Sequence, residues 1–274
     1  WPCPANKRSG LGPCCGFTGC IQTMEPDEYH AMRAVEDRHW WYVGLHDLVI
    51  HAVRCEARKQ GRLLDILDAG CGTGRLCELM QPFGAVTGCD MHPLALEGAA
   101  RRGLDRVVRC DLATDDVGTE AYDLITFMDV LYHRAVADEN AVLRNLHCGL
   151  RKGGLLLMQV AAFESLWGAH DAAVHTRRRY RRGEVVRLLR SAGFTVEFAT
   201  YRLLPWFLPA LLWRSFTRRF PPRASDGKLL SDVASPISPR LNQLLAACVK
   251  AENCLLRSGL RLPLGTSVFV LARK

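Results

Sequence analysis

The chain has no long hydrophobic run. None of its apolar stretches approaches the roughly 18 residues that a membrane-spanning helix needs, and no apolar segment near its first residue resembles a secretory signal peptide. These absences argue against a membrane-spanning or exported protein, and we expect a cytoplasmic one. A hydrophobic fraction of 49% with 23% charged residues is typical of a globular domain with a sizeable core.

The first 23 residues lack the paired cysteine spacing of a zinc site, although the whole chain contains 12 cysteines. Four of them stand there without a Cys-x-x-Cys pair: Cys3, Cys14, Cys15 and Cys20. A zinc knuckle is therefore disfavoured. We expect residues 1–23 to be a disordered leader or a cloning artefact, with Met24 as the natural start. The other eight cysteines are scattered, which is typical of reduced, buried thiols rather than a disulfide framework.

Acidic residues are scarce in two segments of a chain whose net charge is +8. Residues 177–190 contain seven arginines and one acid, and residues 201–223 contain five arginines and no acid. Because the basic charge is regional, these segments are candidates to meet an anionic partner. No aromatic stacking platform accompanies the arginines, so a nucleic acid is not favoured as that partner.

Strands and helices alternate through most of the sequence. Residues 25–59 have a mostly helical pattern, interrupted by the aromatic cluster 39–42 and by Gly44. The hydrophobic pattern then predicts strands at 63–67, 85–89, 106–110, 122–128, 155–160, 194–200 and 267–272, and helices at 75–81, 93–102, 138–150, 184–192 and 241–256. Strands that alternate with helices of this length indicate βαβ units and a parallel sheet.

A glycine-rich turn follows the first expected strand, in the octet Leu-Asp-Ala-Gly-Cys-Gly-Thr-Gly at 67–74. Its glycines permit a tight turn and a close approach of the backbone to a ligand. Acids stand at the carboxyl ends of four strands, where open α/β sheets collect their ligands: Asp68, Asp90, Asp111 and Asp129. Asp90 stands 22 residues after Asp68, a spacing at which an acid reaches ribose hydroxyls. The pattern predicts a nucleoside-bearing cofactor.

These motifs resemble, in order, those of the class I S-adenosylmethionine-dependent methyltransferases. Besides the octet, the matching stretches are Gly-Cys-Asp-Met (88–91), Arg-Cys-Asp-Leu (109–112), Tyr-Asp-Leu-Ile-Thr-Phe-Met-Asp-Val-Leu-Tyr-His (122–133) and Leu-Arg-Lys-Gly-Gly-Leu-Leu-Leu (150–157). The resemblance covers about residues 36–200 and the last strand. It implies an α/β, Rossmann-like sheet of seven mostly parallel strands with helices on both faces, an antiparallel strand 7 and a helical insert between strands 6 and 7.

The chain then divides into four expected parts after the leader. They are an N-terminal helical cap at 24–60, a cofactor-binding core at 61–202, a helical, amphipathic insert at 203–265 and a final core strand at 266–274.

The resemblance also implies residues that bind S-adenosylmethionine and its product S-adenosylhomocysteine. Asp68 would lie near the amino group of the methionine part, Gly70 and Gly72 would pass against that part, and Asp90 would accept bonds from both ribose hydroxyls. The further implied contacts are Met91, Asp111 and Leu112 around the adenine, Met128, Asp129 and His133 on the wall near the sulfonium, Trp41 and Tyr42 in an aromatic segment over the cofactor, and Ala69, Cys71 and Gly74 in the turn. For the aromatic segment, plain helix packing is the alternative.

A dehydrogenase is the competing interpretation of the glycine turn. Dinucleotide-binding turns prefer Gly-x-Gly-x-x-Gly, whereas the third glycine arrives one residue early here, at Gly74. S-adenosylmethionine has no pyrophosphate to place on the helix amino terminus, so the tighter turn fits it better.

The Asn/Asp-Pro-Pro-Tyr/Phe motif of base methylation is absent after strand four. We therefore expect a small-molecule or lipid-linked acceptor, methylated on oxygen, with nitrogen as the second choice.

The loop after the fifth strand carries the candidate catalytic residues His170, Asp171, His175 and Tyr180. Imidazole titrates near neutrality, so either histidine is a candidate base for the acceptor's proton; shaping the loop by hydrogen bonds is the alternative role. No third ligand accompanies them, so no metal is expected. Ubiquinone-pathway O-methyltransferases carry Glu-x-x-Glu-His after strand four. Residues 129–133 lack the second acid, so neither their metal nor their quinol substrate carries over.

Residues 203–213 are apolar, contain two prolines and are followed by four arginines. This segment would lie at a membrane interface with the arginines toward anionic head groups, or form a lid over the acceptor pocket, or make a homodimer contact. Residues 203–223 are thus the candidate for peripheral membrane contact. The sequence predicts a methyltransferase; the alternative is a non-catalytic protein that binds the cofactor and acts through its insert.

Overall fold

The computed structural model describes residues 26–219 and 237–274. Its strands are β1 (Leu64–Ala69), β2 (Gly84–Asp90), β3 (Val107–Arg109), β4 (Tyr122–Met128), β5 (Leu150–Ala161), β6 (Thr195–Arg202) and β7 (Ser267–Arg273). They form one sheet in the order β3-β2-β1-β4-β5-β7-β6. All neighbours pair in parallel except β7, which is antiparallel to both β5 and β6. The predicted seven-stranded, mostly parallel fold is confirmed.

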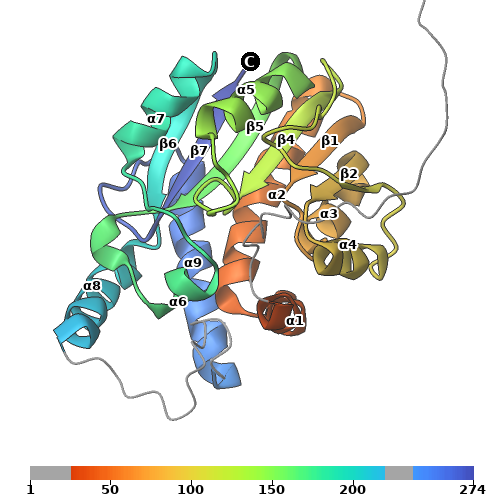
Figure 1. The fold of residues 1–274 in the computed structure, drawn as a ribbon. Helices are drawn as coiled ribbons and strands as arrows, with labels where there is room; N and C mark the ends of the chain where they lie inside the picture. The colour runs from red at the N-terminus through yellow and green to blue at the C-terminus, as the bar shows by residue number, and fades with distance from the viewer. Residues whose placement is uncertain (1–25, 220–236) are drawn as a thin grey trace, which may run out of the picture.

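Helices cover both faces of this sheet and one of its ends (Figure 1). They are α1 (Pro26–Val35), α2 (Trp40–Gln60), α3 (Arg75–Met80), α4 (Pro93–Ala100), α5 (Glu139–Gly149), α6 (Ala169–Ala173), α7 (Arg182–Ser191), α8 (Leu204–Arg219) and α9 (Pro239–Arg257). In Figure 1, α5 lies in front of the sheet and α2 with α9 behind it. α1, α6 and α8 lie below the sheet, at the end to which β1 and β4 point. The expected leader at 1–23 lies outside the described residues.

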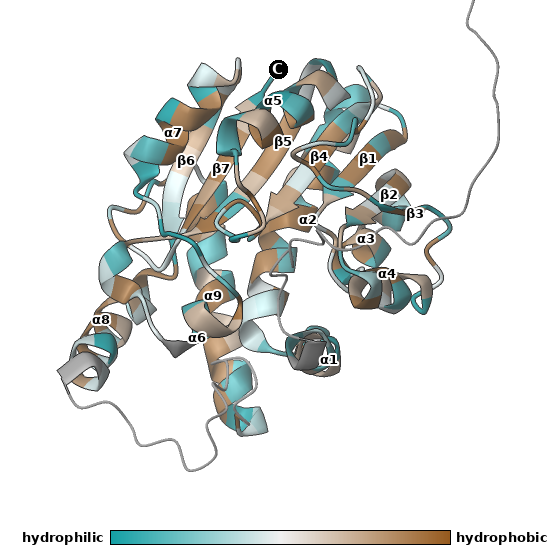
Figure 2. Ribbon diagram, viewed as in Figure 1, coloured by the Kyte–Doolittle hydropathy of each residue, from teal (hydrophilic) through white to brown (hydrophobic). Residues whose placement is uncertain are grey.

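The central strands are buried on both faces because helices cover both. Figure 2 shows hydrophobic residues concentrated along β1, β4 and β5, and every residue of β1 except Asp65 is buried. Such near-continuous apolar runs are typical of parallel strands. All eight cysteines of the described residues are free. Four of these are exposed, however, so the expectation of buried thiols holds only for Cys71, Cys77, Cys89 and Cys110.

The helical pattern is interrupted at residues 36–39, so only His39 of the predicted aromatic cluster 39–42 lies in the break. α2 begins at Trp40, with the ring of His39 accepting a hydrogen bond from the Trp41 N–H. Gly44 is also helical. A Cβ on this residue would come within 2.2 Å of Val249 Cγ1 on α9, so the glycine permits two helices to pack closely.

The insert after β6 consists, in the described residues, of α8 and α9. α9 packs along α2, where the Asn253 side chain donates to the Gly44 carbonyl and Arg257 pairs with Asp47 at 2.7 Å. Near its start, Asn242 accepts from the Trp40 N–H. α9 is therefore fixed to α2, while α8 lies at the end of the sheet formed by the carboxyl ends of the parallel strands.

Candidate functional site

One cavity of about 560 Å³ lies at the carboxyl ends of the parallel strands, a size typical of small-molecule sites. The predicted site residues that line it are Trp41, Tyr42, Asp68, Gly70, Cys71, Gly72, Asp90, Met91, Asp111, Leu112, Met128, Asp129, His133, His170 and Asp171. Four predicted residues are not among its lining: Ala69, Gly74, His175 and Tyr180. The fold thus gathers residues from six separate segments around one space.

The glycine turn has the tight backbone conformation that its sequence predicts. Gly70, Gly72 and Gly74 have φ angles of 79°, 53° and 83°, in the left-handed region that favours glycine. A Cβ on Gly70 would lie 2.2 Å from Val130 Cγ2. The N–H groups of Gly70 and Cys71 both donate to the Cys89 carbonyl, which ties the turn to β2. Gly70 and Gly72 therefore present bare backbone to this part of the cavity, beside Cys71 and Thr73.

Asp90 is built into this wall. Its Oδ2 accepts from the Gly72 N–H at 3.0 Å and its Oδ1 from the His92 N–H at 2.9 Å. Burial raises the pKa of this carboxyl above its ordinary value, against the two backbone bonds that lower it. A carboxylate can accept about four hydrogen bonds. Asp90 therefore keeps an acceptor site on each oxygen for ligand hydroxyls.

Asp68 is a buried acid whose oxygens are both engaged. Thr126 Oγ1 donates to Oδ1 at 2.6 Å and Cys77 Sγ to Oδ2 at 3.3 Å. Burial raises the pKa of Asp68 to about 6. The carboxyl group is thus oriented by its neighbours at the base of the glycine turn.

The amino-terminal helices cover the cavity, and here the sequence analysis missed residues. Tyr29, Met32 and Glu36 line the cavity. The ring of Tyr29 stacks on His92 with centroids 4.4 Å apart, and Glu36 accepts hydrogen bonds from Thr73 and Arg102. No motif marks these residues, because only the packing of α1 against the core brings them to the site.

The loop after β5 carries two of its four candidate catalytic residues to the cavity. Asp171 lines it, but its carboxylate accepts from Arg179 at 2.8 and 3.0 Å and from the Gly168 N–H at 2.7 Å, so it orders the loop. Tyr180 is fully buried, and its hydroxyl donates to Glu139 at 2.8 Å. His175 has φ +50° and lies outside the cavity lining. His170 remains the candidate of this group.

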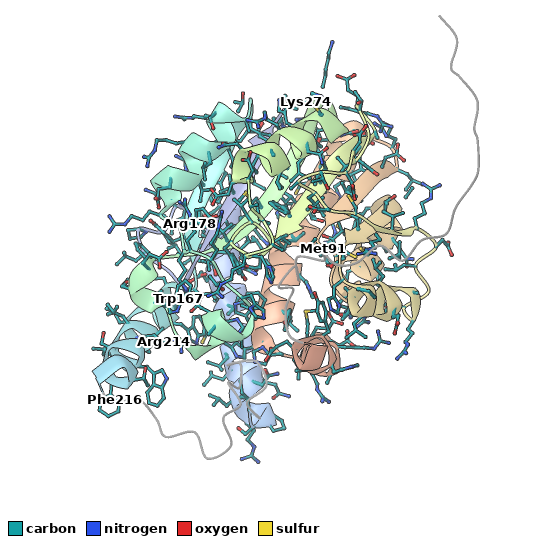
Figure 3. All side chains as sticks on the ribbon, in the orientation of Figure 1. Met91, Trp167, Arg178, Arg214, Phe216 and Lys274 are labelled. Carbon is teal, nitrogen blue, oxygen red and sulfur yellow. The ribbon has the colours of Figure 1, made fainter. Side chains whose placement is uncertain are left out.

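α8 closes the far side of the cavity with one face. Trp206, Ala210 and Arg214, spaced four residues apart, line the cavity, and the Trp206 ring stacks on Trp40 with centroids 4.9 Å apart. Figure 3 shows Arg214 on the inner part of α8 and Phe216 at its outer end. The outer face exposes large apolar side chains, namely Leu208, Leu212 and Phe216. This set is called the outer α8 face below.

Titratable groups gather where the cavity passes β4. Asp129 has φ +60°, and its Oδ2 accepts from Gln159 Nε2 at 2.7 Å. Burial raises the pKa of Asp129 to about 6. Burial, with the neighbouring His175, lowers the pKa of His133 to about 4. Near neutral pH this wall therefore presents a carboxylate and a neutral imidazole.

No group of three or more His, Cys, Asp or Glu side chains is arranged to hold a metal ion within residues 26–219 and 237–274. No helix in the same ranges is long and apolar enough to cross a membrane.

A family model described as a methyltransferase domain matches residues 45–198. The chain belongs to the S-adenosylmethionine-dependent methyltransferases. A methyltransferase named ubiquinone biosynthesis O-methyltransferase, from Xanthomonas axonopodis pv. citri, is 30% identical over 61% of this chain and 80% of its own length. One of the same name from Bordetella avium is 33% identical over 49% of this chain, which spans only 59% of that relative.

A solved methyltransferase structure shares the fold. It is an S-adenosylmethionine-dependent methyltransferase from Thermotoga maritima, 16% identical, with a TM-score of 0.55 over 90% of this chain and 95% of that one. The cofactor of this methyltransferase is S-adenosylmethionine, and the site fits it. Gly70 and Gly72 line the cavity with backbone alone, and Asp90 has acceptor sites left for hydroxyls.

Proposed function

We propose that this methyltransferase transfers a methyl group to a hydroxyl oxygen of a small, partly apolar acceptor. The observation that carries the proposal is the continuity of the cavity, which runs from the glycine turn to the inner face of α8. The curated relatives whose names specify O-methylation support oxygen as the acceptor atom.

One end of the cavity is suited to the cofactor and the other end to the acceptor. The glycine turn with Asp68 and Asp90 would hold the methionine and ribose parts of the cofactor, which supplies an electrophilic methyl group on a sulfonium when bound. The other end is lined by Leu166, Val174 and Leu203, together with Trp206. These apolar walls favour a ring or an aliphatic chain as the body of the acceptor.

Aligning the acceptor with the methyl group is a large part of what the protein contributes to catalysis. Methyl transfer is an in-line displacement, so holding the acceptor at attack distance removes much of the entropic cost of bringing two molecules together. The stacked rings of Trp40 and Trp206 join α2 to α8 across the cavity and restrict the acceptor's position. They also exclude water from this side.

To identify the acceptor, the protein is incubated with methyl-labelled S-adenosylmethionine and fractionated cell extract. The expected result is one labelled product in the organic-soluble fractions, whose label survives mild alkali as an ether does and an ester does not. Label that appears only in protein or nucleic acid would contradict the proposal. Bound cofactor without any labelled product would favour the non-catalytic alternative.

We further propose that the outer α8 face rests on an anionic membrane surface and gives a lipid-like acceptor access to the cavity. Leu208, Leu212 and Phe216 recur at four-residue spacing on one side of the helix, and Leu212 is 71% exposed. The segment 215–223 has three arginines and no acid, which complements anionic head groups. The same helix lines the cavity with its other face.

Vesicle co-sedimentation tests this contact with a matched pair of variants. Leu212→Asp is expected to abolish sedimentation with phosphatidylglycerol vesicles. Leu63→Asp, which changes an equally exposed leucine (71%) just before β1, is expected to sediment like the wild type. Equal sedimentation of both variants, or a wild-type protein that stays in the supernatant and runs as a dimer, would refute the membrane contact.

A further inference from the structure

Asp129 occupies an unusual place for a structural acid. It follows β4 directly, lines the cavity and has a left-handed backbone with φ +60°. A non-glycine residue in this region is strained by roughly 1–3 kcal/mol, and such strain concentrates at functional sites. Asp68, at the base of the glycine turn, has a donor on each oxygen. The hydrogen bond from Gln159 to Asp129 is to Oδ2.

A buried three-residue chain fixes this carboxylate. Arg202 is fully buried and its Nη1 donates to Gln159 Oε1. A guanidinium has only donors, so the amide oxygen of Gln159 must face Arg202 and the amide nitrogen must face Asp129. Gln159 is itself fully buried. The orientation of the bond to Asp129 is therefore determined from β6 through β5 to the end of β4.

Charged and titratable groups face Asp129 from several elements. Arg202 from β6 and Arg179 from the loop after β5 are its cationic neighbours, and Tyr132 bonds to its carboxyl. Tyr42 of α2 is a further neighbour, with its pKa raised by burial and by the negative charges of Glu36 and Asp129. Burial outweighs the donors and cations and holds the pKa of Asp129 at about 6.

We propose that Asp129 is the general base of the methyl transfer, with Gln159 and Arg202 as its positioning residues. The inference rests on the proposed O-methylation. The acceptor oxygen forms the new C–O bond while the C–S bond breaks and its electron pair passes to sulfur. The hydroxyl proton moves to a carboxylate oxygen of Asp129, which later returns it to water. No further reactant is needed.

The geometry favours Asp129 over two other candidates of the loop, His175 and Asp171. His175 does not line the cavity, and Asp171 is held by Arg179. His170 lines the same cavity and is the rival base. Because a carboxylate and an imidazole both lose their basic form on acidification, the wild-type pH profile alone cannot separate them, and variants are required.

Asp129→Asn removes the base and keeps the side chain's shape. We expect kcat to fall by about 10²–10⁴-fold, and the decline of kcat below about pH 6 to disappear. Binding of S-adenosylhomocysteine, measured by calorimetry, should stay within a few-fold of the wild type. His170→Gln should keep the decline below pH 6. Asp105→Asn, which changes an exposed acid just before β3, should match the wild type in every measurement.

Gln159→Glu tests the positioning role. The new carboxylate would pair with Arg202 and place a like charge beside Asp129. The pH below which kcat declines, the acid limb of the profile, should therefore rise by about one unit or more. A merely structural glutamine would change stability and leave the limb in place.

Two results would overturn the inference: loss of S-adenosylhomocysteine binding in Asp129→Asn, which would make Asp129 a cofactor ligand, or an unchanged kcat and pH limb in that variant. The binding measurement needs no acceptor. The proposed function fails differently, when the wild-type protein itself transfers no label to any hydroxyl compound.

Discussion

Replacing Asp90 tests the cofactor site most directly. In the wild-type protein its two oxygens accept from the N–H groups of Gly72 and His92 and keep further acceptor sites toward the cavity. Asp90→Asn turns one oxygen into an NH₂ donor, which can accept neither a backbone N–H nor a ribose hydroxyl. At least one charge-assisted bond to the ligand is lost, and such a bond is worth about 1.5–3 kcal/mol.

The expected outcome is a 10- to 100-fold weaker binding of S-adenosylmethionine and S-adenosylhomocysteine alike, from the conversion of about 1.4 kcal/mol to a factor of ten. Isothermal calorimetry measures both affinities. The substituted turn also leaves a backbone donor without its partner, so thermal unfolding is recorded in parallel with Asp105→Asn as the control. Unchanged affinity in a folded Asp90→Asn protein would refute the assignment of this acid.

Two further predictions concern the lid and the stability of the core. Trp206→Ala removes the ring stacked on Trp40, a contact worth about 0.5–1.5 kcal/mol. The variant should raise the acceptor KM about 2- to 10-fold and leave cofactor affinity unchanged in calorimetry. Weaker cofactor binding with an unchanged acceptor KM would contradict a lid. Burial opposes ionisation of Asp123, but bonds from Arg62 and Arg151 outweigh it and lower its pKa to about 2. Since that depression stabilises the fold above the unfolded pKa of 3.8, Asp123→Asn should cost about 2 kcal/mol at pH 7. In urea titrations the difference should fade as pH falls from 4 to 2, and a constant difference would count against it.

Much of the cofactor half of the site was readable from sequence because its features are local. The octet at 67–74 dictates a turn that only glycine can make, and an acid at the end of a parallel strand must lie at one edge of the sheet. Asp90, Asp111 and Asp129 therefore reached the predicted cavity. The strands could be predicted for the same reason, since each apolar run is only a few residues long.

Other features depend on contacts between distant segments. The sequence favoured His170 and His175 as bases because of their side chains, but the path of the loop leaves His175 outside the cavity. It treated Trp206 as part of one apolar stretch, whereas the helix turns it inward and Leu212 outward.

The sequence by itself determined the fold, the family and the glycine turn, since these follow from local backbone preferences and the spacing of motifs. Only the tertiary structure decided which acid is supported for chemistry. The orientation of Gln159 is imposed by Arg202, 43 residues later in the chain. A hydrogen-bonded chain of this kind acquires its direction only when the sheet is assembled, because Arg202 on β6 must reach Gln159 on β5 past the intervening strand β7.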